Sequence, residues 1–157
     1  ADEYILTISK YGMAKRSRLG TAEKIHDTDA AGQPKFEDDG SPKMATDGYR
    51  RTKPGAKGVR TMKLDEEHQD SIISVRTIPD IDDHLFLLTK SGMMIRIRVS
   101  QTKETSGKST RGTRVMELRN KQKGGFTAEI IFSSRVSASL LDIDEEGEEL
   151  SDAEEEE

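Results

Sequence analysis

Short apolar runs, each followed by a stretch that alternates apolar and polar positions, predict a β protein. The runs at 4–9 and 84–89 are rich in Ile, Leu and Thr, and a Lys-x-Gly sequence follows each of them. Gly12 and Gly92 can adopt the positive φ of a tight hairpin turn. The residues after these turns alternate with the period of two that is typical of a half-buried strand. No segment sustains an apolar stripe at i, i+3 and i+4 over three turns, so the pattern does not favour helices.

The predicted strands belong to an internal repeat. The stretch "YILTISKYGMAKRSRL" (4–19) aligns with "HLFLLTKSGMMIRIRV" (84–99), and "KGVRTMKL" (57–64) aligns with "RGTRVMEL" (111–118). The two registers differ by 26 residues, so the first copy of a unit of about fifty residues carries an insertion. The strands expected in the two copies are 4–9, 13–19, 58–64 and 71–78, and then 84–89, 93–99, 112–118 and 127–136. Four short antiparallel strands per unit are typical of a propeller blade.

The repeat divides the chain into three parts. We expect a blade-like repeat at 1–80 with an insertion at 20–49, a second repeat with a closing strand at 81–141, and an acidic tail at 142–157. The insertion scatters Gly, Pro, Asp and Ser without periodicity, which predicts a mobile surface loop. The tail is expected to be disordered, because it cannot bury enough apolar area to offset the entropy of ordering.

The net charge of −5 hides an uneven distribution of charge. The tail has eleven acidic residues and no basic one, and the insertion has seven acidic and three basic residues. The remaining 111 residues therefore carry a net charge of +10. A basic body with acidic attachments predicts a polyanionic partner, with a tail that competes for the same surface. The tail residues expected to regulate binding in this way are Asp144, Glu145, Glu146, Glu148, Glu149, Glu154, Glu155, Glu156 and Glu157.

Arginine pairs on the return strands are the first candidates for binding that polyanion. Alternation places Arg16 with Arg18, and Arg96 with Arg98, on one face of their strands. Arginine is the planar, weakly hydrated donor that suits phosphate oxygens. A solvated sheet face is the alternative for any one pair, but the same pattern occurs in both repeats.

Two glycine-containing loops, "YRRTKPGAKGVR" (49–60) and "KETSGKSTRGTR" (103–114), are the second candidates. Exposed backbone N–H groups beside cations form anion-binding concavities, whereas an ordinary polar turn is the alternative. The complete set of residues predicted to bind the polyanion is Lys10, Lys15, Arg16, Arg18, Arg50, Arg51, Lys53, Lys57, Arg60, Lys90, Arg96, Arg98, Lys103, Lys108, Arg111 and Arg114. Without an aromatic row or a recognition helix, the expected contact is with a phosphate backbone of a nucleic acid and tolerates any sequence.

Several kinds of chemistry find no support in the sequence. There is no cysteine, which excludes disulfides and fits a reducing cytoplasm. The three histidines are far apart, so no metal site is predicted. The sequence G-x-x-x-x-G-K-[ST] does not occur, and nothing resembles a nucleophile beside its base. We therefore predict no catalytic residue and no cofactor in this chain.

The hairpins, the basic glycine loops and the acidic tail together resemble the C-terminal domain of the DNA gyrase A subunit, in the type II topoisomerase family. The resemblance rests on "EYILTISKYGMAKRSRL", "RTKPGAKGVRTMKL", "DHLFLLTKSGMMIRIRVSQ" and "STRGTRVMEL", and on the tail. It covers residues 3–157 except the insertion at 20–49. It implies a β-pinwheel, a propeller-like disc with a basic rim, of which this chain looks like the last two blades.

The resemblance also implies a function and partners. The family's domain wraps duplex DNA and so supports ATP-dependent negative supercoiling, an isomerase activity whose ATP and Mg²⁺ belong to other parts of the parent enzyme. The implied partners are double-stranded DNA, the remaining blades and catalytic core of the A subunit, and the gyrase B subunit in an A2B2 assembly. The implied location is the bacterial cytoplasm, at the nucleoid.

Two alternatives stay open. The glutamine-arginine-glycine box of the gyrase family is missing, and "YRRTKPGAKG" is at best a degenerate relative of it, which leaves room for the equivalent domain of topoisomerase IV. A propeller fragment that binds proteins rather than DNA would need an exposed apolar patch, which the sequence does not indicate. Because two blades have two open ends, we expect the chain to need further blades or copies to complete a disc.

Overall fold

Nine strands and one short 3-10 helix make up the regular structure that the computed structural model describes, which covers residues 3–29, 31, 33–105 and 110–140. The strands are β1 (Tyr4–Ser9), β2 (Met13–Arg18), β3 (Lys24–His26), β4 (Met44–Thr46), β5 (Ile72–Ile78), β6 (His84–Thr89), β7 (Met94–Arg98), β8 (Thr113–Arg114) and β9 (Ile130–Val136). The 3-10 helix is Val99–Gln101. The predicted hairpins β1–β2 and β6–β7 are confirmed, each with a positive-φ glycine at its turn. No helix within the described part of the chain could cross a membrane.

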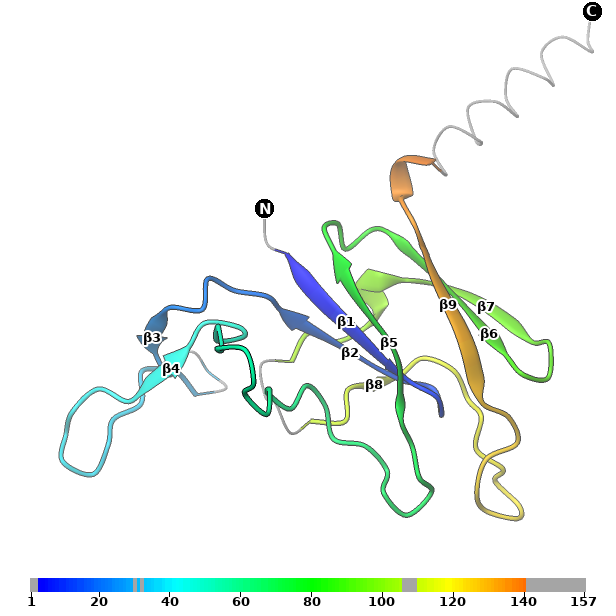
Figure 1. Ribbon diagram of the computed structural model, residues 1–157, viewed down its shortest axis with the longest axis horizontal. Helices are drawn as coiled ribbons and strands as arrows, with labels where there is room; N and C mark the ends of the chain where they lie inside the picture. The colour runs from blue at the N-terminus through cyan, green and yellow to red at the C-terminus, as the bar shows by residue number, and fades with distance from the viewer. Residues whose placement is uncertain (1–2, 30, 32, 106–109, 141–157) are drawn as a thin grey trace, which may run out of the picture.

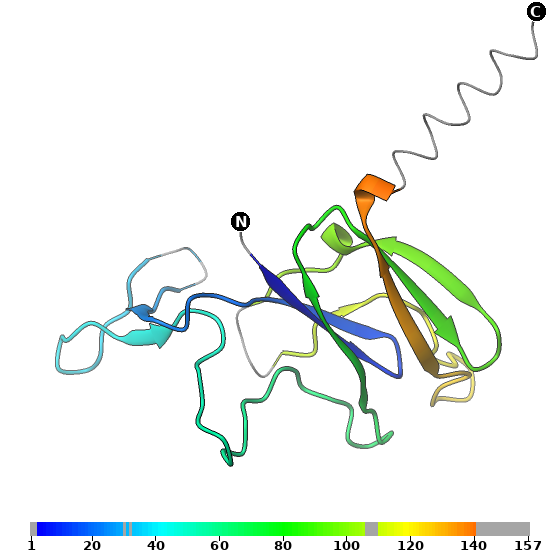
Figure 2. The same cartoon turned by 45° about the horizontal axis from the view of Figure 1, so that its top comes forward.

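Two antiparallel sheets pack against each other (Figures 1 and 2). The first has the strand order β5-β1-β2-β8 and the second has the order β7-β6-β9. Leu6 and Ile8 of β1 and Leu85 and Leu87 of β6 are fully buried in one apolar core. Since these residues are spaced two apart on their strands, each sheet turns one apolar face toward the other.

The fourth strand of the first sheet comes from the second repeat. Strand β8 pairs with β2, and Ala14 is the register partner of Thr113. The four-stranded sheet of the first repeat is therefore completed by a strand from the second repeat. Residues 58–64, where the repeat predicts the corresponding strand of the first unit, contain no strand. The edge of β2 that such a strand would join is occupied by β8.

Two pairs of glycines at equivalent positions of the repeats show where the repeats contact each other. A Cβ atom on Gly12 would lie 2.3 Å from the carbonyl oxygen of Met116, and one on Gly112 would lie 2.3 Å from the carbonyl oxygen of Ala14. At the equivalent positions Gly92 and Gly58, a Cβ atom would meet nothing within 4 Å among the described residues. The two repeats therefore exchange a strand at one place, where β8 pairs with β2. The equivalent surfaces, around Gly92 and around Gly58, are not covered by described residues.

The insertion at 20–49, predicted as a mobile surface loop, forms a hairpin arm that contains one short pair of strands. Strands β3 and β4 pair antiparallel, and the arm extends from the first sheet on the side away from the second (Figures 1 and 2). Two acidic side chains accept backbone hydrogen bonds at its turns: Asp29 from Ala31 at 2.8 Å and Asp39 from Ser41 at 2.9 Å. Cross-strand pairing and these turns give the segment its order without an apolar stripe.

Candidate nucleic-acid interface

The segment that follows the first basic loop is bonded to the second loop. The backbone N–H of Lys63, three residues after the first loop, donates to the carbonyl oxygen of Thr110 at 2.9 Å. The predicted cations of the first loop are all exposed, and none of them forms an ion pair with a described residue: Arg50, Arg51, Lys53, Lys57 and Arg60. Five exposed cations without carboxylate partners make this loop the most strongly positive segment of the described structure.

The second loop contributes fewer unneutralised cations. Lys103 is exposed. Arg114 is also exposed, but its guanidinium donates to Glu117 at 2.9 Å. The charge of Arg111 is among the causes that lower the pKa of Asp65, after the hydrogen bonds from His68. Lys108 lies outside the described residues, as do all the predicted tail residues.

Strand β7 shows the alternation that the sequence predicts. Arg96 and Arg98 are exposed, whereas Ile95 and Ile97 are half-buried toward the first sheet. Among the described residues, neither arginine forms an ion pair. The open face of the second sheet thus carries two guanidinium groups.

The equivalent arginine of the first repeat has different surroundings. Arg16 is paired with Leu6 and lies on the face of the first sheet that packs toward the second. Its guanidinium stands over the ring of Tyr4 at 5.0 Å, and its Nε and Nη1 have no hydrogen-bond partner within the described structure. The prediction that Arg16 lies on a solvent-facing cationic face is therefore wrong. Arg18, at the end of the same strand, is exposed.

Lys15 is a second correction, because its side chain is only 1% exposed. Its Nζ donates to the carbonyl oxygen of Thr61 at 2.6 Å, beneath the segment 57–64. Burial lowers the pKa of Lys15 below the ordinary value, because the charged form loses hydration. A side chain in this position cannot reach a phosphate on the surface, so Lys15 does not belong to the interface.

The lysines beside the hairpin turns are partly engaged. Lys10 is half-buried and lies over the ring of Tyr11 at 4.7 Å. Lys90 is exposed and stands 3.7 Å from a carboxylate oxygen of Glu129. Contacts at this exposure are weak and break readily, so both ammonium groups stay available to a stronger anion.

Sequence reasoning missed one cluster of polar side chains. Asp65, Glu67 and His68 bring candidate ligand atoms within 4.8 Å of one another. Asp65 accepts from the backbone N–H of His68 at 3.3 Å and lies 3.0 Å from its Nδ1. These hydrogen bonds lower the pKa of Asp65 and close a local turn, which accounts for the cluster. The distant histidines in the sequence gave no signal for it.

Comparison with known proteins places this architecture in a family. The family model for the DNA gyrase C-terminal domain, a β-propeller, matches residues 43–79 and 83–123. The chain belongs to the family of DNA gyrase A C-terminal domains. The expected propeller-like, all-β fold is thereby confirmed.

The chain is also similar to individual gyrase and topoisomerase IV proteins. The DNA gyrase A subunit of Ureaplasma parvum serovar 3 (strain ATCC 700970) is 31% identical over 75 residues, which are 48% of this chain and 9% of that protein. A crystal structure of the C-terminal domain of DNA topoisomerase IV covers 87% of this chain and 32% of its own, with a TM-score of 0.52 and 19% identity. A structure of a DNA gyrase A C-terminal domain covers 85% of this chain and 50% of its own, with a TM-score of 0.44 and 18% identity.

The segments matched by the gyrase family model leave out most of the arm. It includes both basic loops and the β6–β7 hairpin, but it begins at residue 43. The first strand of the arm and its tip therefore lie outside the matched segments. Any role of the arm has to be argued from its own residues.

Proposed function

We propose that the chain binds duplex DNA without sequence preference and wraps it, as part of the C-terminal domain of a gyrase-type A subunit. The exposed cations of the loop at 50–60, which have no carboxylate partner in the described structure, are the observation that carries the proposal. Arg98, Lys103 and Arg111 are further exposed cations of the predicted set. Membership in the family supports the same role.

The energetics of wrapping require many contacts of this kind. Bending 20–30 bp by 40–90° costs on the order of 1–6 kcal/mol. Each neutralised phosphate releases condensed counterions and contributes about 0.9 to the slope of log K against log[salt]. Cations repeated from blade to blade therefore suit a bent duplex, because several weak contacts together offset the bending energy.

Further repeats would complete the binding surface. The outer edge of β7, where Met94 is 64% exposed, corresponds to the edge of β2 that β8 occupies. A strand from another repeat of the same domain would pair with this edge of β7, as β8 pairs with β2. By analogy with Arg16, such a repeat would partly cover Arg96 and leave Arg98 exposed. The catalytic core of the A subunit, the B subunit, ATP and Mg²⁺ would belong to the parent enzyme in the bacterial cytoplasm.

The equivalent domain of topoisomerase IV is the second candidate. The observation that favours it is the fold likeness to a topoisomerase IV C-terminal domain over 87% of this chain. Both candidates bind duplex DNA, and they differ in whether the bound duplex is wrapped with a defined sign. Ligation of nicked circles in the presence of the chain measures this. A reproducible change in linking number supports gyrase-type wrapping, and unchanged linking number with retained binding supports the alternative.

A salt titration tests the interface residues. In Lys57→Gln combined with Arg60→Gln, the slope of log K against log[salt] for a duplex of about 150 bp should fall by roughly one to two units. The matched control is Lys121→Gln combined with Lys123→Gln, which removes two exposed lysines from outside the predicted set. Equal slopes for the wild type and the loop variant would exclude this loop from the interface. Wild-type affinity below measurement at low salt would overturn the function itself.

A further inference from the structure

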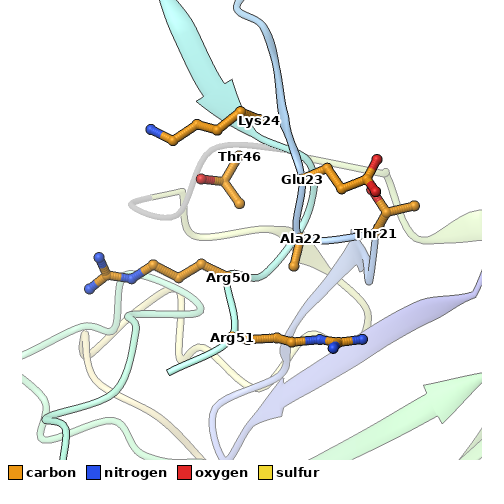
Figure 3. Close-up of a pocket in the computed structure, with 7 residues that line it drawn as sticks. All are labelled: Thr21, Ala22, Glu23, Lys24, Thr46, Arg50 and Arg51. Carbon is orange, nitrogen blue, oxygen red and sulfur yellow. The ribbon is translucent and has the colours of Figure 1, made fainter. Parts of the chain in front are cut away.

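The neck of the arm is positively charged although the arm is acidic. Residues 20–49 carry seven acidic and three basic side chains, a net charge of −4. Where the arm joins the first sheet, however, a cavity of about 490 Å³ brings three cations together with a single carboxylate. Figure 3 shows the residues that line it: Thr21, Ala22, Glu23, Lys24, Thr46, Arg50 and Arg51.

Three hydrogen-bond donors lie on the same side of this cavity. Lys24 of β3 is the register partner of Thr46 of β4, so their side chains share one face of the arm. Figure 3 shows the ammonium of Lys24, the hydroxyl of Thr46 and the guanidinium of Arg50 directed to one side. Glu23 and Arg51 extend to the opposite side in the same view. The carboxylate is thus separated from the three donors.

These donors have no acceptor of their own. Within the described structure, neither Lys24 nor Arg50 forms an ion pair. A guanidinium, an ammonium and a hydroxyl without an acceptor are suited to a tetrahedral oxyanion, because its several oxygens can accept from all three.

The backbone that carries the donors is held in place. Tyr49 donates its backbone N–H to Leu19 at 3.0 Å, and its hydroxyl lies 2.8 Å from Thr61 Oγ1. The carboxylate of Asp47 accepts from the backbone N–H of Thr21 at 2.8 Å and from its hydroxyl at 3.1 Å. Because Thr46 and Arg50 flank these anchored residues, binding has to order the side chains of the site but not the backbone that carries them.

The position of the neck indicates which oxyanion it holds. Arg50 opens the loop at 50–60 that we assign to DNA, so a phosphate at the neck would be continuous with the contacts along that loop. The distal arm, residues 27–43, has five acidic and two basic residues and so a net charge of −3, although Lys35 pairs with Asp27 at 3.4 Å. A duplex is therefore attracted to the neck and kept from the tip.

We propose that the neck of the arm is a phosphodiester site, in which Lys24, Thr46 and Arg50 bind one phosphate of the duplex. This inference rests on the proposed DNA-binding function and adds Lys24 and Thr46, which lie in an insertion without a counterpart in the second repeat. The arm then acts as a guide that fixes the lateral position of the duplex on the rim: its base binds and its tip repels.

Two measurements on the full chain test the site. The variant is Lys24→Gln with Arg50→Gln, and the matched control is Lys121→Gln with Lys123→Gln, which makes the same change of charge at exposed positions outside the arm. For duplex DNA, the slope of log K against log[salt] should fall by about 0.9 in the variant only, with roughly fivefold weaker binding at fixed salt. In a ¹⁵N NMR titration with inorganic phosphate, the amides of Thr46 and Arg50 should shift in the wild type and not in the variant.

The possible outcomes test the phosphodiester site and the proposed DNA-binding function separately. A variant with the slope and affinity of the control overturns the phosphodiester site, even if inorganic phosphate still shifts the neck amides, because the site would then take free phosphate only. If the wild type binds no duplex, the DNA-binding function fails, and the phosphate titration decides the neck separately. Shifts at Thr46 and Arg50 would then support an oxyanion site, and unchanged amides would overturn it.

Discussion

Substituting alanine for the glycine at each of the two equivalent hairpin turns tests whether the repeats exchange a strand. Gly12 and Gly92 occupy the same position in their repeats and have nearly equal φ values of 88° and 86°. Substitution by alanine therefore imposes the same backbone cost at both, about 1–2 kcal/mol for a left-handed conformation. The difference between the two variants isolates what the neighbouring repeat contributes.

The structure predicts a clear difference. A Cβ atom at position 12 would lie 2.3 Å from the carbonyl oxygen of Met116, whereas one at position 92 would meet nothing within 4 Å. The oxygen belongs to backbone that is tied to the turn, since the N–H of Val115 donates to the carbonyl oxygen of Gly12 at 2.9 Å. Forcing these atoms apart should cost roughly 1–3 kcal/mol beyond the shared backbone cost.

Urea denaturation of the chain measures the difference. Gly12→Ala should lower the free energy of unfolding by about 2–5 kcal/mol, and Gly92→Ala by only about 1–2 kcal/mol. With an m-value of about 1–3 kcal/mol/M, the two midpoints should differ by roughly 1 M. The reciprocal pair, Gly112→Ala against Gly58→Ala, should give the same order. Equal losses within either pair would refute the strand exchange, and with it the argument for further repeats at β7.

Two more predictions concern Lys15 and the arm. Because the pKa of Lys15 in the folded chain lies below its ordinary value of 10.5, the unfolded chain binds more protons between those two values, and the stability of the wild type should rise with pH across that window. In Lys15→Met this rise should be lost, and a stability difference from the wild type that is constant between neutral pH and pH 11 in chemical denaturation would contradict the buried charge. Deletion of residues 21–47 would join Gly20 to Gly48, whose φ values of 69° and 64° match a type I′ turn between Leu19 and Tyr49. The free energy of unfolding should then change by no more than about 1 kcal/mol, and a broadened or non-cooperative urea transition would show that the arm is part of the core.

Much of the local structure follows from the sequence alone. The two hairpins were predictable because a Lys-x-Gly turn and strands of period two are local signals, and the register partners Leu6 with Arg16 and Phe86 with Arg96 follow from the turn. The repeat and the concentration of cations in the loop at 50–60 were also readable, since both depend only on order along the chain. These features were sufficient to recognise the family.

The arrangement of the surfaces was decided by tertiary structure. Arg16 and Arg96 have the same place in the repeat, yet one is covered by a neighbouring sheet and the other is exposed. Lys15 is buried because the segment 57–64 passes over it, and β8 joins a strand about a hundred residues earlier in the chain. Alternation along a strand specifies which side chains share a face, but which face is covered depends on contacts between segments distant in sequence. The same physical reason explains the arm, whose order comes from pairing across its own length and whose neck gathers Lys24 and Arg50 from opposite ends of the insertion.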